Sequence, residues 1–412
     1  MSFQRRPLSQ GDLNLFILAH ERFAEGRPGG RRLSLKFVDL RGLDLSGRNL
    51  EEADFSGCSL ETARLSGARM ARAVLFCCDL KAADFTGADL RRADLRGACL
   101  RGADLQDADL TGADFREGVI AIPHAQKGLQ SVKHETRQGV ADGARFAGAR
   151  LDEAAFDGFS AQKADFTDCS MRGARLTGAN LKDADLSGAM MHGASVDGAN
   201  LSGARMVGAV LTDVAMETAR VERTDMTGSL RNPAPDAIQK AKALFELALD
   251  ANAWAESGGV FGQPAVFDGE DLRPLAGKLA GLKLSAMSAK GACMVGLDLR
   301  GLALQGANFE GADLRGCDLR GADLRGARMG GALLNMADLR GAMMSPLPLG
   351  PARSMAVVLT GAILRYARLD DADLTQARLD QADLTGASLN LARLDDGQRA
   401  ALGLAPMAAK AA

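Results

Sequence analysis

The chain has 412 residues, with 50 Lys and Arg against 52 Asp and Glu, and therefore a formal net charge of −2. A balance so close to neutral is typical neither of a strongly basic nucleic-acid binder nor of a strongly acidic protein that imitates DNA. The 4 histidines have no metal-ligand spacing, and the sequence has no Walker loop, dinucleotide fingerprint or nucleophile elbow. We therefore expect no enzyme, no bound metal and no cofactor.

The first expected element is a capping helix within residues 1–30. Ser9 is a candidate N-cap, Asp12 follows at the third position, and Leu13 and Ile17 recur along one side. The start of the chain has no apolar run long enough for a signal peptide, and no stretch of the sequence is long enough to span a membrane. We therefore expect a cytoplasmic protein without a membrane partner.

A five-residue period governs residues 31–120. In ADLRRADLRGACLRGADLQDADLTGADF a large apolar residue stands at position 90 and at every fifth position to 115, with a small residue two places earlier. A helix repeats every 3.6 residues or so and a strand about every 2, so neither explains the pattern. A short fixed repeat is typical of a solenoid, in which each unit buries its apolar residue by stacking on its neighbours.

An insertion then interrupts the period. The large residue returns one position out of phase at Phe146, so the residues between are extra chain, which we assign to an inserted loop at 121–142. A long loop on a regular scaffold is often functional, whereas a tolerated insertion without a role is the other interpretation. The candidate partner-binding residues in it are His124, Lys127, Lys133 and His134.

The rest of the chain repeats this alternation of blocks and interruptions. Asp236 as N-cap and Gln239 as its capping-box partner predict a helix, which Gly258 and Gly259 end. We expect this helix to seal the end of one stack and lead into the next. The expected segments are a second repeat block at 143–229, a helical connector at 230–277, a third repeat block at 278–395 with a Pro-rich loop at 345–356, and a C-terminal cap and tail at 396–412.

The repeated units carry a specific resemblance. ADLRG, ANLKD, ADLSG, ANLSG and ADLTG resemble the A(D/N)LXX units of the pentapeptide-repeat family. The resemblance implies an all-β solenoid, a right-handed quadrilateral β-helix with four pentapeptides in each coil, to which we add short capping and connecting α-helices. Residues twenty apart in an unbroken block would then stack directly above one another.

Stacking would turn outward residues into columns. Arg300, Arg320 and Arg340 would form one column beside a column of aspartates from three copies of the triplet DLR. These arginines are candidate partner-binding residues, because an arginine ladder could hold an acidic partner. The other interpretation is a solvated wall of small net energetic value.

Outward apolar residues are rarer. Met343 and Ile363 are twenty apart, so we expect them to stack, with Val358 on an adjacent face and the Pro-rich segment SPLPLGP beside them. If that segment folds back it covers these residues, and if it projects they form a patch for a partner or a second copy. All three are candidate partner-binding residues.

These observations predict a non-catalytic scaffold that binds another protein, whose identity the sequence does not reveal. Members of the family that protect DNA gyrase resemble this layout, which implies the alternative of a gyrase- or topoisomerase-binding protector that acts by partial DNA mimicry. The interspersed charges argue against close mimicry, and we expect no direct binding of nucleic acid. A homodimer is a further option. Cys58 and Cys78 are twenty apart and should stack as a reduced pair.

Overall fold

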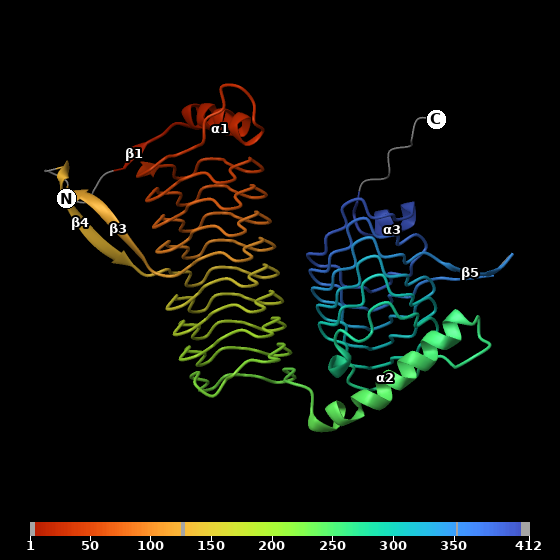
Figure 1. Ribbon diagram of the computed structural model, residues 1–412. Coiled ribbons are helices and arrows are strands. Elements are labelled where there is room, and N and C mark those ends of the chain that lie inside the picture. The colour runs from red at the N-terminus through yellow and green to blue at the C-terminus, as the bar shows by residue number, and fades with distance from the viewer. Residues whose placement is uncertain (1–4, 125–127, 352, 405–412) are drawn as a thin grey trace, which may run out of the picture. The chain divides into compact units, whose positions relative to one another are not determined.

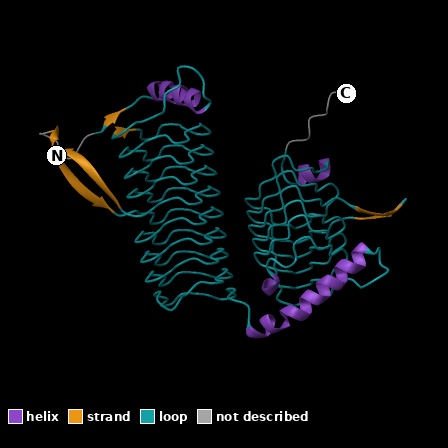
Figure 2. Cartoon of the chain, viewed as in Figure 1, coloured by secondary structure: helices purple, strands orange, loops and turns teal. Residues whose placement is uncertain are grey.

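The computed structural model describes residues 5–124, 128–351 and 353–404. The chain divides into two compact units, Met1–Asn232 and Pro233–Ala412 (Figure 1). Most of both units consists of short bridged segments that the cartoon draws as loop (Figure 2). The regular elements are β1 Arg6–Pro7, α1 Gln10–Ala24, β2 Val38–Asp39, β3 Gly118–His124, β4 Gly128–Arg137, α2 Pro235–Glu256, the short 3-10 turn η1 Arg273–Leu275, β5 Leu347–Gly350, β6 Arg353–Met355 and α3 Asp396–Ala401.

The repeats form a β-helix in which residues twenty apart stack, as predicted. Asp54 bridges Val74 in parallel register, and the next bridges along the coil follow at intervals of five residues. Each bridged residue donates its backbone N–H to the coil before it, and the apolar residue after it donates to the coil that follows. Ser59 thus donates to the carbonyl oxygen of Val38 at 3.0 Å, and Leu60 donates to that of Asp79 at 2.7 Å.

The chemistry of the unit explains its composition. The bridged Asp accepts the backbone N–H two residues later, as Asp84 does from Thr86 at 3.0 Å, which closes a tight turn at the corner of the coil. The next residue of the repeat adopts a left-handed backbone conformation, which favours glycine. In another repeat, for example, Gly97 has a φ of 66°. The Ala and Leu positions point inward and are almost completely buried.

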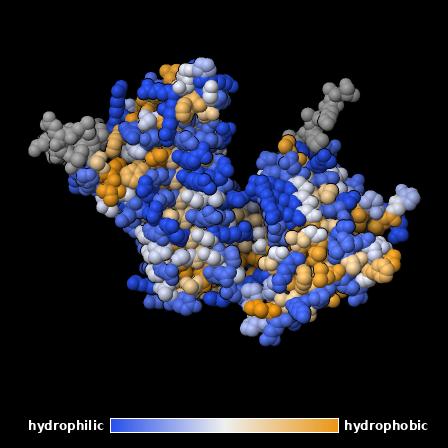
Figure 3. All heavy atoms as spheres, viewed as in Figure 1, coloured by the Kyte–Doolittle hydropathy of each residue, from blue (hydrophilic) through white to orange (hydrophobic). Residues whose placement is uncertain are grey.

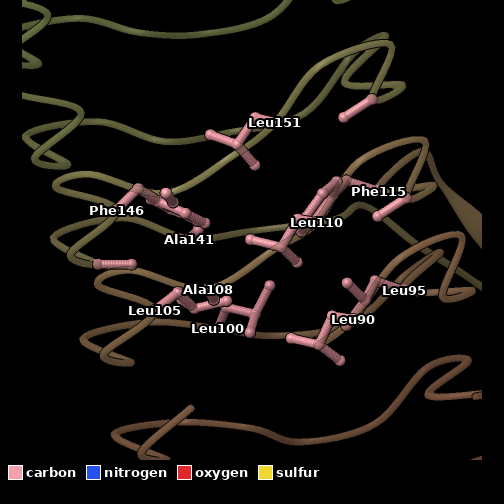
Figure 4. Close-up of a cluster of buried hydrophobic side chains, with 14 of the residues drawn as sticks. Leu90, Leu95, Leu100, Leu105, Ala108, Leu110, Phe115, Ala141, Phe146 and Leu151 are labelled. Carbon is pink, nitrogen blue, oxygen red and sulfur yellow. The ribbon is translucent and has the colours of Figure 1, made fainter. Parts of the chain in front are cut away.

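Figure 4 shows the interior where the first two blocks meet. Phe115 stacks on Phe156 with 4.5 Å between ring centroids, and Phe159 meets Phe115 edge-on at 5.3 Å. Phe159 occupies a position that is usually Ala, whereas the large-residue position two places later is Ala161, and both are buried. The large ring therefore fills the volume that the small residue leaves empty.

The first interruption is an antiparallel hairpin of β3 and β4. Cys99 bridges Val140 across 41 residues, which exceeds the twenty-residue coil by 21 and so explains the phase shift of one. The coil closes again immediately after the hairpin because Val140 donates to Ala98 at 3.1 Å. The hairpin therefore projects from an otherwise unbroken stack.

The stack of the second unit begins earlier than residue 278, the expected start of the third repeat block. Val266 already bridges Ser288, and Asp271 bridges Cys293. Ala265 and Phe267 are buried in this first coil. These bridges span 22 residues rather than twenty, and η1 lies inside the longer coil, which is why the five-residue pattern does not reveal it.

Helix α2 covers the first coil of the second unit, where Leu244 and Ala248 join the core. The predicted capping box of Asp236 and Gln239 is wrong, because the helix begins at Pro235 and its N-cap, Ala234, makes no side-chain hydrogen bond. Proline suits the first helical position, since its ring fixes φ and its missing N–H would have no partner there.

The second unit has its own hairpin and a terminal cap. Arg328 bridges Val358 across 30 residues, so the β5–β6 hairpin adds ten residues, two full repeats, and leaves the phase unchanged. The short helix α3 has a complete capping box between Asp395 and Gln398. The amide nitrogen of Gln398 also donates to the carbonyl oxygens of Leu374 and Ala377 at 2.8 and 2.7 Å, which satisfies part of the open edge of the last coils.

Candidate functional site

The β3–β4 hairpin is fixed to one corner of the first unit. Ile120 on β3 is buried over Gly57, where an added Cβ would lie 3.2 Å from Cδ1 of Ile120 and 2.7 Å from Cε1 of Phe37. Glycine at this corner therefore makes room for the hairpin. The approach is too close for any larger residue at position 57.

A second glycine corner holds the base of the hairpin. An added Cβ at Gly97 would lie 2.7 Å from Sγ of Cys77 and 3.1 Å from the carbonyl oxygen of Arg137. The Arg137 guanidinium donates to the carbonyl oxygen of Cys77 at 3.2 Å and to Glu135 at 3.0 Å. Burial raises the pKa of the Cys77 thiol to about 11, so this cysteine serves as a packed neutral side chain.

A charged side chain covers the aromatic part of the same corner. The Arg96 guanidinium lies 5.4 Å from the ring centroid of Phe76, and it also pairs with Asp94 at 2.8 Å. The stack thus presents an apolar strip of Phe37, Phe76 and Cys77 beneath the hairpin. Sequence reasoning missed this strip, although an aromatic residue at a turn position is a usable signal in a repeat that mostly places small or polar residues there.

The predicted insertion residues lie on the hairpin. His124 is the last residue of β3, and Lys133 and His134 lie on β4 opposite Ile122 and Ala121. The side chains of Lys133 and His134 are exposed. Lys127 lies outside the described residues. Val119 is also exposed, at 56%, so the hairpin offers apolar and basic side chains together.

The three DLR triplets form a ladder of ion pairs in the second unit. Asp298 bridges Asp318, which bridges Asp338. Each arginine donates from Nε and Nη2 to the aspartate two residues before it, and the Nη2 contact is 2.6 Å in all three pairs. Arg300 and Arg320 also reach the next aspartate of the column, at 3.5 and 3.8 Å.

This pairing keeps both partners charged. The hydrogen bond from Arg300 lowers the pKa of Asp298 below its usual value, and the same bond raises the pKa of Arg300. At Asp338 burial raises the pKa, but the hydrogen bonds from Arg340 outweigh it and the net shift is downward. Because each arginine is held by a carboxylate of its own triplet, the ladder favours the interpretation as a solvated wall.

The predicted apolar patch does not form. Met343 bridges Asp323 and Asp373, whereas Ile363 bridges Leu333 and Asp383. The expectation that Met343 and Ile363 stack is therefore wrong, because the ten-residue hairpin between them moves Ile363 two columns away. Val358 lies in the column between, and of the three only Met343 is clearly exposed, at 40%.

The β5–β6 hairpin packs on another pair of glycines. An added Cβ at Gly326 would lie 2.8 Å from Cβ of Leu347 and 2.9 Å from Cε of Met355. At Gly306, one coil earlier, an added Cβ would lie 3.3 Å from Cε of Met355. The apolar base of this hairpin thus covers the glycine corner rather than the residues that the sequence pointed to.

The first unit also carries a surface pocket of about 420 Å³ beside β1. Its residues come from separate repeats and from the start of the chain, so no local pattern marks it. Arg41, which lines the pocket, already pairs with Asp39 at 2.7 Å. The lining residues are Pro7, Leu8, Asp39, Arg41, Gly42, Glu61 and Thr62.

Within the described ranges no group of three or more His, Cys, Asp or Glu side chains is arranged to hold a metal ion. No helix in those same parts of the chain is long and apolar enough to cross a membrane.

Comparisons with known proteins agree with the repeat architecture. The family model "Pentapeptide repeats" matches residues 34–75, 78–116, 142–178, 162–198, 191–228, 292–331 and 355–390. Among solved structures, HetL, a pentapeptide repeat protein involved in heterocyst differentiation regulation from the cyanobacterium Nostoc, is 22% identical, covers 81% of this chain and 95% of its own, and has a TM-score of 0.24.

A second solved structure is QnrB1, a plasmid-mediated fluoroquinolone resistance protein. It is 22% identical, covers 49% of this chain and 87% of its own, and has a TM-score of 0.26. At these TM-scores neither likeness bears on function. None of the curated proteins compared with the chain matches it.

Proposed function

Because the chain belongs to the pentapeptide-repeat family, we propose that it is a non-catalytic scaffold that binds another protein through elements mounted on a right-handed quadrilateral β-helix. The scaffold holds such elements in place because every coil is hydrogen-bonded to its neighbours. We propose that it acts in the cytoplasm without a cofactor.

The observation that carries this proposal is the β3–β4 hairpin. Its base is locked by Ile120 over Gly57 and by the bond from Arg137 to Cys77, whereas Val119, Lys133 and His134 project into solvent. An element with a rigid base and an exposed mixture of apolar and basic side chains suits an acidic or mixed protein surface. The coil closes at Val140 without it, so stack integrity alone does not explain its presence.

The test removes one hairpin at a time from the full chain. In the first variant a short glycine linker replaces residues 119–136, and in the matched control a similar linker replaces residues 346–355. Partners are captured by chemical cross-linking in cells and identified by mass spectrometry. We expect the first variant to lose specific partners that the control retains in full. A Lys133→Ala variant should retain them in part. Equal partner sets for both deletions would contradict a docking role for the β3–β4 hairpin.

A second candidate function is a gyrase- or topoisomerase-binding protector. One column of bridged residues in the first unit favours this function. The column contains twice as many aspartates as arginines, and the residue two positions after each of its members is uncharged. Arg145 pairs with Asp104 at 2.9 Å, and within the described residues Asp84 and Asp165 accept hydrogen bonds from hydroxyl and backbone donors alone. The column comprises Asp44, Arg64, Asp84, Asp104, Arg145, Asp165, Asp185, Arg205 and Asp225.

Gyrase supercoiling distinguishes the two candidates. The protector predicts that the protein changes supercoiling, or relieves a quinolone block, and that Asp84→Asn with Asp165→Asn weakens the effect. Asp298→Asn, on the ladder of the second unit, is the matched control. No effect of the wild-type protein at micromolar concentration would exclude the protector and leave the scaffold proposal intact.

A further inference from the structure

Helix α1 is apolar on the face that it buries and also on the face that it exposes. Leu13, Ile17 and His20 are fully buried against the first coil. On the other side Leu15 is 68% exposed and Leu18 is 48% exposed. Figure 3 shows hydrophobic residues at the end of the first unit where α1 lies. A capping helix needs only one apolar face, so the second requires its own explanation.

The exposed face has a pattern of its own. Asp12, Leu15, Ala19 and Arg22 follow one another at spacings of three, four and three residues, which places them in one stripe of an α-helix, with Leu18 beside it. Asp12 lies in the first turn and Arg22 in the last. The apolar centre of the stripe therefore has an acidic end and a basic end.

Neither end has a partner of opposite charge within the described chain. Asp12 accepts from the hydroxyl of Ser9 at 2.7 Å, which leaves its charge uncompensated. The two glutamates nearest Arg22 in the sequence are already engaged, Glu21 with Arg48 at 3.6 Å and Glu25 with Arg27 at 2.9 Å. The stripe thus presents two unpaired charges of opposite sign, one on each side of its leucines.

The stripe is complementary to itself. Asp12 and Arg22 are equidistant from position 17, and so are Leu15 and Ala19. We propose that this face, defined as Asp12, Leu15, Leu18, Ala19 and Arg22, is where two copies of the chain associate, with their α1 helices antiparallel about a two-fold axis near position 17. Each Asp12 then meets Arg22 of the second copy, and the leucines pack together at the centre.

The charge pattern favours a second copy over a lipid surface. An anionic membrane would attract Arg22 but repel Asp12, which lies in the same stripe. Antiparallel helices also bring each acidic N-terminal turn beside a basic C-terminal turn, an arrangement that the helix dipoles support. A helix of 15 residues is only about 22 Å long, so the interface lies at the small end of specific interfaces and we expect a micromolar dimer.

The test is sedimentation velocity of the full chain over about 1 to 200 µM. We expect wild type to pass from monomer to dimer in this range and Leu15→Glu to remain monomeric. Arg22→Asp should weaken association by about tenfold or more, because it places two acids opposite each other. The double variant Asp12→Arg with Arg22→Asp restores complementarity and should recover most of the affinity. Leu391→Glu, which alters another exposed leucine, is the control and should not differ from wild type.

Thermal unfolding verifies that each variant folds, which we expect because every altered side chain is exposed in the monomer. A wild-type protein that stays monomeric throughout would overturn the proposal. A dimer whose affinity is unchanged by Leu15→Glu and Arg22→Asp would also overturn it. So would a double variant in which the affinity losses of the two single substitutions add up. Binding of a monomeric wild type, but not of Leu15→Glu, to vesicles of anionic phospholipid would assign the face to a membrane instead.

Discussion

The backbone N–H of Leu33 donates to Nδ1 of His20 at 3.0 Å, and this bond joins helix α1 to the first coil beneath it. His20 is fully buried, and among the described residues its Nε2 has no partner within hydrogen-bond geometry. An imidazole that accepts at Nδ1 must carry its proton on Nε2, so the ring is neutral in the folded cap.

This relationship predicts an acid-sensitive cap. Burial lowers the pKa of His20 below its ordinary value of 6.5, so the unfolded chain binds the proton more readily than the folded one. The contribution of His20 to stability is complete above pH 6.5 and is lost as the pH falls toward the folded pKa, with a slope of at most about 1.4 kcal/mol per pH unit.

Thermal unfolding between pH 8 and pH 5 measures this loss, over an interval that lies above the ordinary pKa values of Asp and Glu, about 3.9 and 4.3. His20→Leu should be less stable at every pH, because the N–H of Leu33 loses its acceptor, but its stability should vary less over this interval. His134→Ala, at an exposed position, should retain the wild-type slope. A wild-type stability that rises on acidification would contradict the prediction.

The exchange of large and small residues at Phe159 and Ala161 predicts a compensating pair. Phe159→Ala should lower the free energy of unfolding by about 3 to 5 kcal/mol, because it leaves a cavity beside Phe115. Ala161→Leu alone should cost about 1 to 3 kcal/mol through overpacking. The double variant restores the usual order of the repeat and should be more stable than the sum of the single losses indicates. Chemical denaturation of all four proteins gives the coupling energy, and simple additivity would show that the two sites do not share a volume.

Substitution of Gly97, at the corner beneath the β3–β4 hairpin, should loosen the base of that hairpin. Gly97→Ala and Gly102→Ala both place a side chain on a left-handed backbone, with φ of 66° and 63°, and each should cost about 1 kcal/mol for that reason. Only at Gly97 does the added Cβ also meet Cys77 and Arg137, whereas nothing lies within 4 Å at Gly102. Gly97→Ala should therefore be the less stable variant and should expose the hairpin to limited proteolysis. Equal proteolysis of the two variants would mean that the hairpin is not anchored at this corner.

The buried cysteines predict slow thiol chemistry. All seven cysteines are free, and Cys58 and Cys78 donate to the carbonyl oxygens of Leu35 and Phe55 at 3.1 and 3.0 Å. Burial raises the pKa of Cys58 to about 11 and raises that of Cys78 further above its usual value, so little thiolate forms near neutral pH. Iodoacetamide labelling at pH 8, read by mass spectrometry, should modify the half-buried Cys99 before either of them. Labelling of all three at one rate in folded protein would refute this, and unfolding in urea is the positive control.

Much of the fold follows from the sequence because the repeat is local. Most pentapeptides supply their own buried apolar residue and their own left-handed corner, often a glycine, and many supply a turn-closing Asp, so the five-residue pattern needs no distant contact to be recognised. The phase shift before Phe146 correctly indicated extra chain, and the constant phase across SPLPLGP correctly indicated a break that leaves the stack in register. The ion-pair columns also follow, because Asp298, Asp318 and Asp338 lie in an unbroken block.

The candidate sites depend on contacts that the repeat does not encode. The separation of Met343 from Ile363 arises because a hairpin changes which residues stack, and counting by twenty fails across it. The coil at Val266 escapes detection because it is two residues too long, and Pro235 displaces the expected cap at Asp236. Only the tertiary structure shows that Ile120 packs on Gly57, or that Leu15 faces solvent while Leu13 faces the core, because each of these depends on how a non-repeating segment docks on a stack built elsewhere in the chain.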